Sequence, residues 1–269
     1  MGARPMTWLP KSVGTLGAGT PFPMGQRVRS LHDEEVPSAD TNPIPFNRLP
    51  DPSINCGHTN VYFRDLTDHL KREILKADLV LGAVAWLTDP TLLDALRTPS
   101  HGCALIVQKE DFLRSDSGDI TRSDWELRLR SQYDALHCEV DRFSLPGLAS
   151  RLSYCSDPSV DAVRCVGNHN SRNTPAAPRM HNKFAVFCKV VDRWDEELQV
   201  SLPTVRPYAY WTGSFNWSRN AGLSFENAVL VYDKKAAEAA AEEWGNIFSL
   251  SESLDWCSPW VAPEYRIGS

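Results

Sequence analysis

Two continuous apolar segments constrain the fold of this chain more than any other feature. Residues 79–87 and 103–108 are apolar at nearly every position and have the length of a strand. Residues 89–96 lie between them with helical spacing, and Pro90 falls in the first turn, where proline is tolerated. Strands that are apolar on both faces are typical of a parallel sheet covered by helices. The pattern therefore predicts a β-α-β unit.

The alternation of strands and helices continues on both sides of this unit. A short strand pattern at residues 61–63 and a helical pattern at 65–78 precede it. The segments predicted after it are helix 121–136, strand 139–143, a polar loop at 144–178, strands 183–190, 208–212 and 228–232, and helix 234–248. This order predicts an α/β sandwich in which a mixed central sheet is flanked by helices on both faces.

The N-terminal part of the chain has a different composition. Residues 1–52 contain nine of the 19 prolines, interleaved with glycines, and show no periodic apolar pattern. Proline lacks a backbone donor and fixes φ, so we expect an irregular leader over residues 1–55. We expect one folded domain over residues 56–255 and a C-terminal tail over residues 256–269.

Composition limits the class of protein. A content of 42% hydrophobic and 23% charged residues is near the average of folded proteins, which excludes a wholly disordered chain and a coiled coil. The longest apolar run is shorter than the roughly 20 residues of a membrane span, and the first 30 residues lack the apolar block of a signal peptide. The seven cysteines are an odd number without close pairing, which favours reduced thiols. We expect a cytoplasmic protein with no stable membrane association.

Three short segments in the second half of the chain carry groups suited to phosphate chemistry. The segments are His181-Asn182-Lys183, Gly213-Ser214-Phe215-Asn216 and Glu226-Asn227. Alternate residues of a strand share a face, so the imidazole of His181 projects together with the ammonium of Lys183. This arrangement pairs a nucleophile with a fixed cation. We expect the carboxylate of Glu226 to orient the imidazole.

The glycine-containing segment supplies further groups for a bound phosphate. Gly213 permits a close backbone approach, Ser214 offers a hydroxyl, and Asn216 offers amide donors. These are the groups expected around a tetrahedral phosphate.

Together, the segments resemble the motifs of the phospholipase D superfamily, in which H-x-K is followed by G-S-x-N and by a Glu-Asn pair. The similarity spans residues 60–249. The chain has a single H-x-K, like the small homodimeric bacterial endonucleases of the family. The resemblance implies phosphodiester cleavage through a phosphohistidine at His181, with the partner's His181 as general acid. Lys183 and Asn216 of both chains would stabilise the phosphoryl charge, with no metal and no cofactor.

The chain departs from the family pattern at two places. The longer motif, H-x-K-x4-D, would place an aspartate at position 188, where this chain has Cys188. This difference leaves open a catalytically weakened nucleic-acid-binding module. The span from 189 to 208 contains four acidic residues and predicts an extended acidic hairpin.

Charge distribution favours nucleic acid as the substrate. The net charge of −6 argues against a protein that coats a polyanion, but residues 151–190 carry a net charge of +4. Arg179, next to the H-x-K motif, is the best single candidate for a phosphate contact. Trp211 and Trp217 are candidates for base stacking, with a place in the core as the alternative. We expect DNA or RNA as the substrate, and a phospholipase D-type lipid hydrolase is the alternative.

A zinc site is a further alternative for the cysteines. Cys155, Cys165 and His169 lie in the long loop, and Cys56 and His58 lie upstream. No C-x2-C pair accompanies them, so we expect scattered structural thiols rather than metal ligands.

Overall fold

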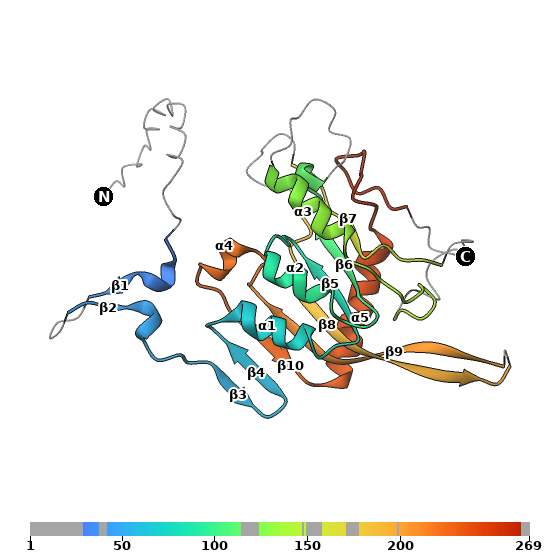
Figure 1. The fold of residues 1–269 in the computed structure, drawn as a ribbon, viewed down its shortest axis with the longest axis horizontal. Coiled ribbons are helices and arrows are strands. Elements are labelled where there is room, and N and C mark those ends of the chain that lie inside the picture. The colour runs from blue at the N-terminus through green and yellow to red at the C-terminus, as the bar shows by residue number, and fades with distance from the viewer. Residues whose placement is uncertain are drawn as a thin grey trace, which may run out of the picture.

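The computed structural model describes residues 29–37, 42–113, 124–146, 148, 158–170, 178–197 and 199–264. Its centre is an eight-stranded sheet with the order β3-β4-β10-β9-β8-β5-β6-β7 (Figure 1). These strands are β3 (Ile54–Cys56), β4 (Thr59–Tyr62), β5 (Leu79–Val84), β6 (Cys103–Gln108), β7 (Val163–Val166), β8 (Lys183–Asp195), β9 (Val200–Gly213) and β10 (Ala228–Val231). The pairs β5–β6 and β6–β7 are parallel and the other pairs are antiparallel, so the sheet is mixed.

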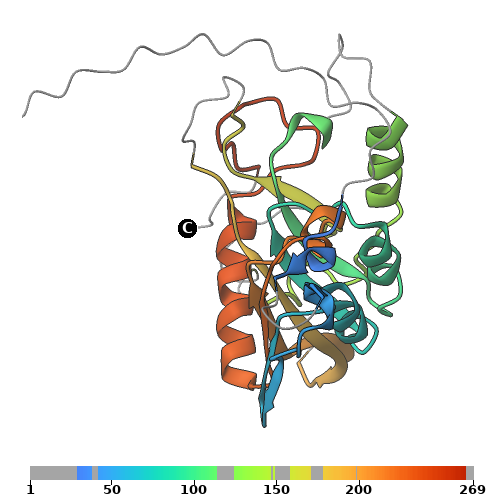
Figure 2. The ribbon, with the colours of Figure 1, turned by 90° about the vertical axis from the view of Figure 1, so that its left-hand side faces the viewer.

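Helices cover both faces of the sheet. The helices are α1 (Leu66–Ile74), α2 (Pro90–Leu96), α3 (Asp124–Asp134), α4 (Arg219–Gly222) and α5 (Lys234–Ser249). Figure 2 shows α5 on one side of the sheet and α1, α2 and α3 on the other. One buried cluster includes side chains of these three helices, and a second includes side chains of α5. The predicted α/β fold, a mixed sheet with helices on both faces, is confirmed.

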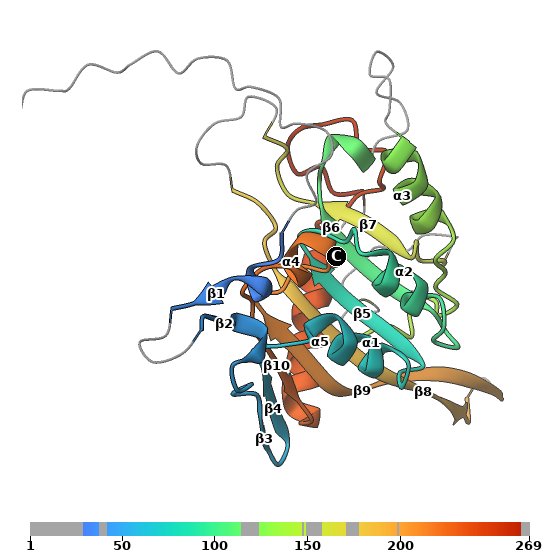
Figure 3. The same ribbon diagram turned by 60° about the vertical axis from the view of Figure 1, so that its left-hand side comes forward.

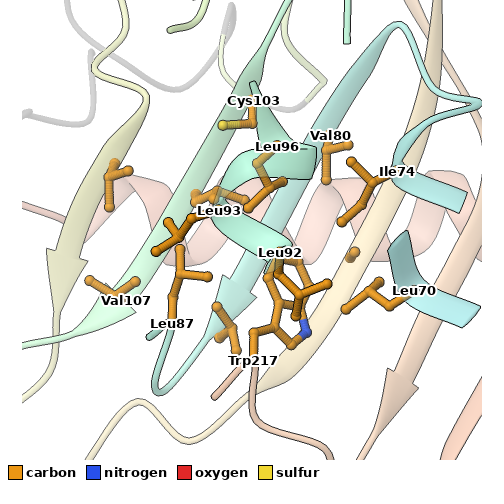
Figure 4. Close-up of a cluster of buried hydrophobic side chains, with 14 of the residues drawn as sticks. Leu70, Ile74, Val80, Leu87, Leu92, Leu93, Leu96, Cys103, Val107 and Trp217 are labelled. Carbon is orange, nitrogen blue, oxygen red and sulfur yellow. The ribbon is translucent and has the colours of Figure 1, made fainter. Parts of the chain in front are cut away.

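The apolar strand β5 explains the two-sided core. All six of its residues are buried. Val80 and Val84 belong to the cluster under α1 and α2, whereas Leu79, Leu81 and Ala83 belong to the cluster under α5. Figure 4 shows leucines of α2 packed beside Trp217 in the first cluster. Alternate side chains of one strand therefore fill both layers.

Helix α2 begins where the sequence predicts. The carboxylate of Asp89 accepts a hydrogen bond from the backbone N–H of Thr91 at 2.8 Å, and Pro90 occupies the first turn. This cap ends the β5–α2 turn two residues after Leu87 and fixes the path of the chain there.

Two predictions for the middle of the chain are wrong. The expected strand 139–143 is a turn, in which the backbone N–H of Ser144 donates to the Asp141 carboxylate at 2.8 Å. The expected loop 144–178 contains β7, which pairs with β6 from Leu105↔Val163 onward. Strand β7 has only four residues, and Arg164 interrupts its apolar pattern, so periodicity does not reveal it.

The N-terminal segment contacts the body of the fold. It contains β1 (Glu35–Val36) and β2 (Ile44–Pro45), which form a separate two-stranded sheet. Short 3₁₀ helices occur at Leu31–Asp33, Phe46–Arg48 and, after β6, Asp111–Leu113. The Leu31 N–H donates to the Leu223 carbonyl at 2.9 Å, and the rings of Phe46 and Phe225 lie 4.4 Å apart. These contacts join the segment to the loop that leads to β10.

The long hairpin predicted at residues 189–208 is confirmed. Strands β8 and β9 remain paired as far as Asp195↔Val200, and the hairpin projects beyond the other strands (Figure 1). Among the described residues, no helix combines the length and apolar composition that a bilayer crossing requires.

Candidate active site

The three motif segments meet at one end of the sheet. His181 precedes β8, Gly213 ends β9, and Glu226 lies two residues before β10. Strands β8, β9 and β10 are antiparallel neighbours, so the start of β8, the end of β9 and the start of β10 lie together. Val84, the last residue of β5, pairs with Lys183, which brings the carboxyl end of β5 to the same place.

His181 and Lys183 share a partner in Trp86. The imidazole of His181 is exposed and meets the indole edge-to-face, with ring centroids 5.5 Å apart and an interplanar angle of 82°. The buried Lys183 ammonium lies 5.9 Å from the centroid of the same indole and donates to the His181 carbonyl at 2.7 Å. Trp86 lies two residues after the end of β5, and Lys183 is the first residue of β8, so the sheet positions both side chains.

The surroundings of the imidazole favour its neutral form. Partial desolvation, followed by the positive charges of Lys183 and Arg179, lowers the pKa of His181 below its ordinary value. Within the described residues, neither ring nitrogen of His181 has a hydrogen-bond partner. Burial also lowers the pKa of Lys183, and the negative charge of Glu226 opposes that effect. The site therefore holds a basic nitrogen that is free to attack, beside a partly desolvated cation.

Ser214 and Glu226 form the second part of the site. The Ser214 hydroxyl donates to the Glu226 carboxylate and accepts a hydrogen bond from the backbone N–H of Asn227 at 3.0 Å. The Ser214 N–H donates in turn to the Asn227 carbonyl at 3.1 Å. Within this chain Glu226 binds Ser214 and is not among the groups that contact His181, so the geometry gives no support to the prediction that Glu226 orients the imidazole of its own chain.

The other residues of the G-S-x-N segment differ in their roles. Asn216 is half-buried, and its amide oxygen is buried without a hydrogen-bond partner within the described part of the chain. A Cβ on Gly213 would lie 2.2 Å from the Asn227 carbonyl oxygen. The approach of β10 therefore requires this glycine, independently of any phosphate.

The tryptophans next to the motif belong to the core. Trp211 and Trp217 have no exposed surface, and both lie in the cluster under α1 and α2. Neither indole offers a face to a base, so the predicted stacking and the assignment of Trp217 to substrate binding are wrong. The Trp217 backbone has another role, because its carbonyl accepts hydrogen bonds from the N–H groups of Thr88 (2.8 Å) and Asp89 (3.0 Å). These bonds join the motif to the β5–α2 turn.

Sequence reasoning missed two residues of the site, Trp86 and Glu110. The Glu110 carboxylate accepts a hydrogen bond from the Trp86 indole N–H at 3.3 Å and lies 3.7 Å from the Arg179 guanidinium. Both residues closely follow the carboxyl ends of parallel strands, β5 and β6. That position is where open α/β sheets bind ligands, and it was the signal available in the sequence.

The predicted basic segment at residues 151–190 does not act as one surface. Arg164 is buried and paired with Asp161 and Glu264, and Lys189 is paired with Asp78 at 2.9 Å. Arg151 and Arg172 lie outside the described residues. Arg179 and Lys183 are the basic residues of this segment that lie at the candidate site.

The cysteines give no support to a zinc site. The Cys165 thiol is buried and donates to the Ser253 carbonyl at 3.1 Å, and His169 lies 3.2 Å from Asp111. Cys155 lies outside the described residues. Across the described ranges, no three His, Cys, Asp or Glu side chains are grouped as metal ligands.

Cys188 lies away from the candidate site. It is fully buried in the cluster under α5, where desolvation raises the pKa of its thiol. Five residues of extended strand, roughly 16 Å, separate it from Lys183. A role for position 188 in the chemistry of His181 therefore has no support in this geometry.

Comparisons with known proteins give limited similarity. No family model matches the chain. An uncharacterized protein of Acanthamoeba polyphaga mimivirus is 29% identical over 212 residues, which are 73% of this chain and 67% of that protein. Among solved structures, NucT from Helicobacter pylori has a TM-score of 0.44 and 13% identity, over 72% of this chain and 98% of that chain. Nuc from Salmonella typhimurium, a phospholipase D family member, has a TM-score of 0.40 and 12% identity, over 72% and 95%.

Proposed function

We propose that this chain is a phosphodiesterase of the phospholipase D type that cleaves the backbone of nucleic acids. The observation that carries the proposal is the meeting of the H-x-K, G-S-x-N and Glu-Asn segments at one end of the sheet. The His181 imidazole, whose pKa is lowered, lies there beside the Lys183 ammonium, and neither ring nitrogen is hydrogen-bonded to another described residue. Asn216 adds a half-buried amide at the same end of the sheet. Attack on a phosphodiester needs such a nucleophile together with groups that stabilise phosphoryl charge.

The proposed reaction has two displacements at phosphorus. A ring nitrogen of His181 attacks, the bond from phosphorus to the leaving sugar oxygen breaks, and that oxygen takes a proton from the partner's His181. Water then attacks the phosphohistidine and gives a proton back to the partner's His181. The phosphorus–nitrogen bond breaks, which restores the His181 imidazole and releases a phosphomonoester.

The other site residues act on charge and position. The Lys183 ammonium and the Asn216 amide stabilise the negative charge on the phosphoryl oxygens as it develops. Glu226 holds the Ser214 hydroxyl and faces the Lys183 charge, so it positions the groups around the phosphate. Trp86 holds the imidazole and the ammonium in register.

The proposal includes a homodimer. One chain supplies a single H-x-K histidine, whereas the reaction needs both a nucleophile and a general acid. An isologous two-fold interface that brings together the exposed His181 of both chains satisfies this need with one gene product. Sedimentation at the assay concentration should give twice the chain mass, and a monomer that cleaves its substrate at the full rate would contradict the composite site.

Nucleic acid is favoured as the substrate class by the exposed cation beside the nucleophile. Arg179 is exposed near His181 and contributes positive charge at the imidazole, although Glu110 lies 3.7 Å away, which gives the site a local attraction for a polyanion in a chain of net charge −6. Lipid phosphodiesters remain the competing substrate class, and the assay includes them.

The test is cleavage of labelled single-stranded DNA, duplex DNA, RNA and phosphatidylglycerol vesicles in excess chelator. Wild type should cleave nucleic acid, and His181→Ala should lower the rate by at least about 10³-fold. His58→Ala is the matched control, because His58 is exposed in the β3–β4 turn, at the other end of the sheet. Equal rates for wild type and His181→Ala, or cleavage of the lipid alone, would overturn the proposal.

A further inference from the structure

A groove of about 590 Å³ is lined by residues of α3, of α4 and of the turn that begins α2. Figure 3 shows how these three helices are arranged on one face of the sheet. Thr88 and Pro90 line the groove from the start of α2, Trp125 and Arg128 from α3, and Arg219 from α4. This volume falls within the roughly 300–1,000 Å³ of pockets that take small ligands. The groove is outside the set of residues to which the proposed reaction assigns a role.

Backbone contacts join one wall of the groove to the G-S-x-N segment. The Thr88 N–H donates to the Trp217 carbonyl at 2.8 Å, so the β5–α2 turn and the G-S-x-N segment lie side by side. Thr88 is two residues from Trp86, which contacts His181, and Arg219 is three residues from Asn216. The groove therefore borders the segments that carry Trp86 and Asn216.

Helix α3 lines this groove with both polar and apolar side chains, Trp125, Arg128, Leu129, Ser131 and Gln132. Its buried Tyr133 packs in the core, and the Tyr133 hydroxyl donates to the Leu87 carbonyl at 2.5 Å. That bond ties the helix to the turn after β5. Trp125 and Arg128 are three positions apart and so lie on one face of the helix.

The side chains of the groove include an exposed aromatic ring and two arginines. Trp125 is 48% exposed, and its ring is tilted against that of Phe112, with ring centroids 5.5 Å apart. In the part of the chain that the structure describes, Arg128 and Arg219 are exposed and have no carboxylate partner. By contrast, Arg130 on the same helix is paired with Asp134 and Asp255. On this helix, Arg130 is therefore paired with carboxylates, whereas Arg128 is available to an external anion.

We infer that this groove binds an unpaired nucleotide of a single-stranded nucleic acid, next to the phosphate that is cleaved. Trp125 stacks on the base, and Arg128 and Arg219 contact flanking phosphates. In a duplex the faces of the bases are stacked inside the helix, so a protruding indole has access to an unpaired base only. A nucleic acid strand carries one phosphate at each nucleotide. The two arginines can therefore contact phosphates on either side of the stacked base. The inference rests on the proposed function and names its substrate class.

Binding is measured in a His181→Ala background, so that cleavage does not remove the probe. The probe is a fluorescein-labelled 15-nucleotide oligodeoxythymidylate, and a 15-base-pair duplex is measured in parallel. Trp125→Ala should weaken binding of the single strand roughly 5- to 150-fold and leave duplex binding unchanged. Arg128→Ala and Arg219→Ala should each reduce the slope of log K against log salt by about 0.7.

The β8–β9 hairpin supplies matched controls at the far end of the sheet. Trp194 is 53% exposed, and Arg193 is an exposed arginine with no ion pair among the described residues. Trp194→Ala and Arg193→Ala should bind the oligonucleotide as the parent protein does. If the groove variants bind like these controls, or if Trp125→Ala weakens duplex binding equally, the inference is wrong. Loss of binding to phosphatidylglycerol vesicles alone would also overturn it.

A second assay separates failure of the groove from failure of the chemistry. Bis(p-nitrophenyl) phosphate is a diester without a nucleobase, and wild type and Trp194→Ala should hydrolyse it at equal rates. If wild type hydrolyses this diester and the groove variants bind the oligonucleotide normally, only the inference about the groove is refuted. If the groove variants lose binding and no diester is hydrolysed, the proposed catalysis is refuted. The inference that the groove binds the single strand is then supported. Thermal melting of each variant confirms that it is folded.

Discussion

The buried lysines of this fold differ in what surrounds them. Lys109, directly after β6, has no exposed surface, and its ammonium lies 2.5 Å from the Glu252 carboxylate and donates to the carbonyls of Ser258 and Trp260. Lys183, at the start of β8, is 8% exposed and donates to the His181 backbone carbonyl. One lysine is enclosed by acceptors contributed by the C-terminal residues, and the other has donor capacity left for a ligand.

The arginines also fall into two groups, those with acidic partners and those without. Arg164 is buried among Asp161, Glu264 and Ser251, whereas Arg128 and Arg219 are exposed beside the candidate site without an acidic partner among the described residues. A buried cation with a full set of acceptors stabilises the fold only while those acceptors are present. A cation near a site that lacks them is available to a substrate. The pairing of each side chain, rather than the charge of a sequence segment, distinguishes the two roles.

The largest effect is expected from breaking the structural pair. Lys109→Met leaves the Glu252 carboxylate, which is 4% exposed, buried without its cation. Removal of one partner of a buried ion pair costs about 3–5 kcal/mol. The free energy of unfolding, measured by urea titration, should fall by that amount.

The control for this variant is Lys189→Ala, because Lys189 also pairs with a carboxylate, that of Asp78, but is half-exposed. It should change the free energy of unfolding by no more than about 1 kcal/mol. The double variant Lys109→Met/Glu252→Gln removes the stranded charge and should recover part of the lost stability. If Lys109→Met unfolds at the same urea concentration as wild type, the contrast between the two lysines is wrong.

The opposite outcome is expected for Lys183→Met. Because burial lowers the pKa of Lys183, the unfolded chain holds this proton more tightly than the native chain, and the charged lysine reduces native stability near neutral pH. Methionine removes that cost, so the melting temperature should not fall. Cleavage should drop roughly 10²- to 10³-fold, as is typical when a group that stabilises developing charge is removed.

Two outcomes would contradict this assignment of Lys183. A large loss of stability would place Lys183 with Lys109 as a structural cation. Retention of the full cleavage rate would remove it from the chemistry. The conservative variant Lys183→Arg keeps a charge on a bulkier group and should restore less than the full rate, because the site at the start of β8 is enclosed by Trp86 and the sheet.

The elements that the sequence predicts correctly are those whose residue pattern lies within one short stretch of the chain. Strands β5 and β6 and helices α2 and α5 are long or uniformly patterned, so their sequences identify them. Strand β7 is four residues long and is buried by β6 and by the C-terminal residues around Glu252. Its burial depends on segments about 60 and 90 residues away. No local pattern carries that information.

The same distinction applies to the candidate site. The H-x-K and G-S-x-N segments are contiguous, so His181, Lys183 and Asn216 can be found from the sequence. The contacts of Trp86 with His181 and Glu110 depend on which strands are neighbours, as does the pairing of Arg164 with Glu264, 100 residues away. These pairings decided which of the predicted basic residues reach the site.

The smallest effect is expected at the exposed cation beside the nucleophile. Arg179 is one of the positive charges that lower the pKa of His181, after desolvation and Lys183. Arg179→Gln should therefore raise the pKa of His181 and move the acid limb of kcat/KM for bis(p-nitrophenyl) phosphate to higher pH, since less imidazole is neutral at a given acidic pH. A pH profile and an NMR titration of the His181 ring should shift together, while Arg193→Gln on the hairpin should shift neither. A shift to lower pH, or the same profile for both variants, would show that Arg179 does not act on the imidazole and would leave Lys183 as the cation that sets its protonation.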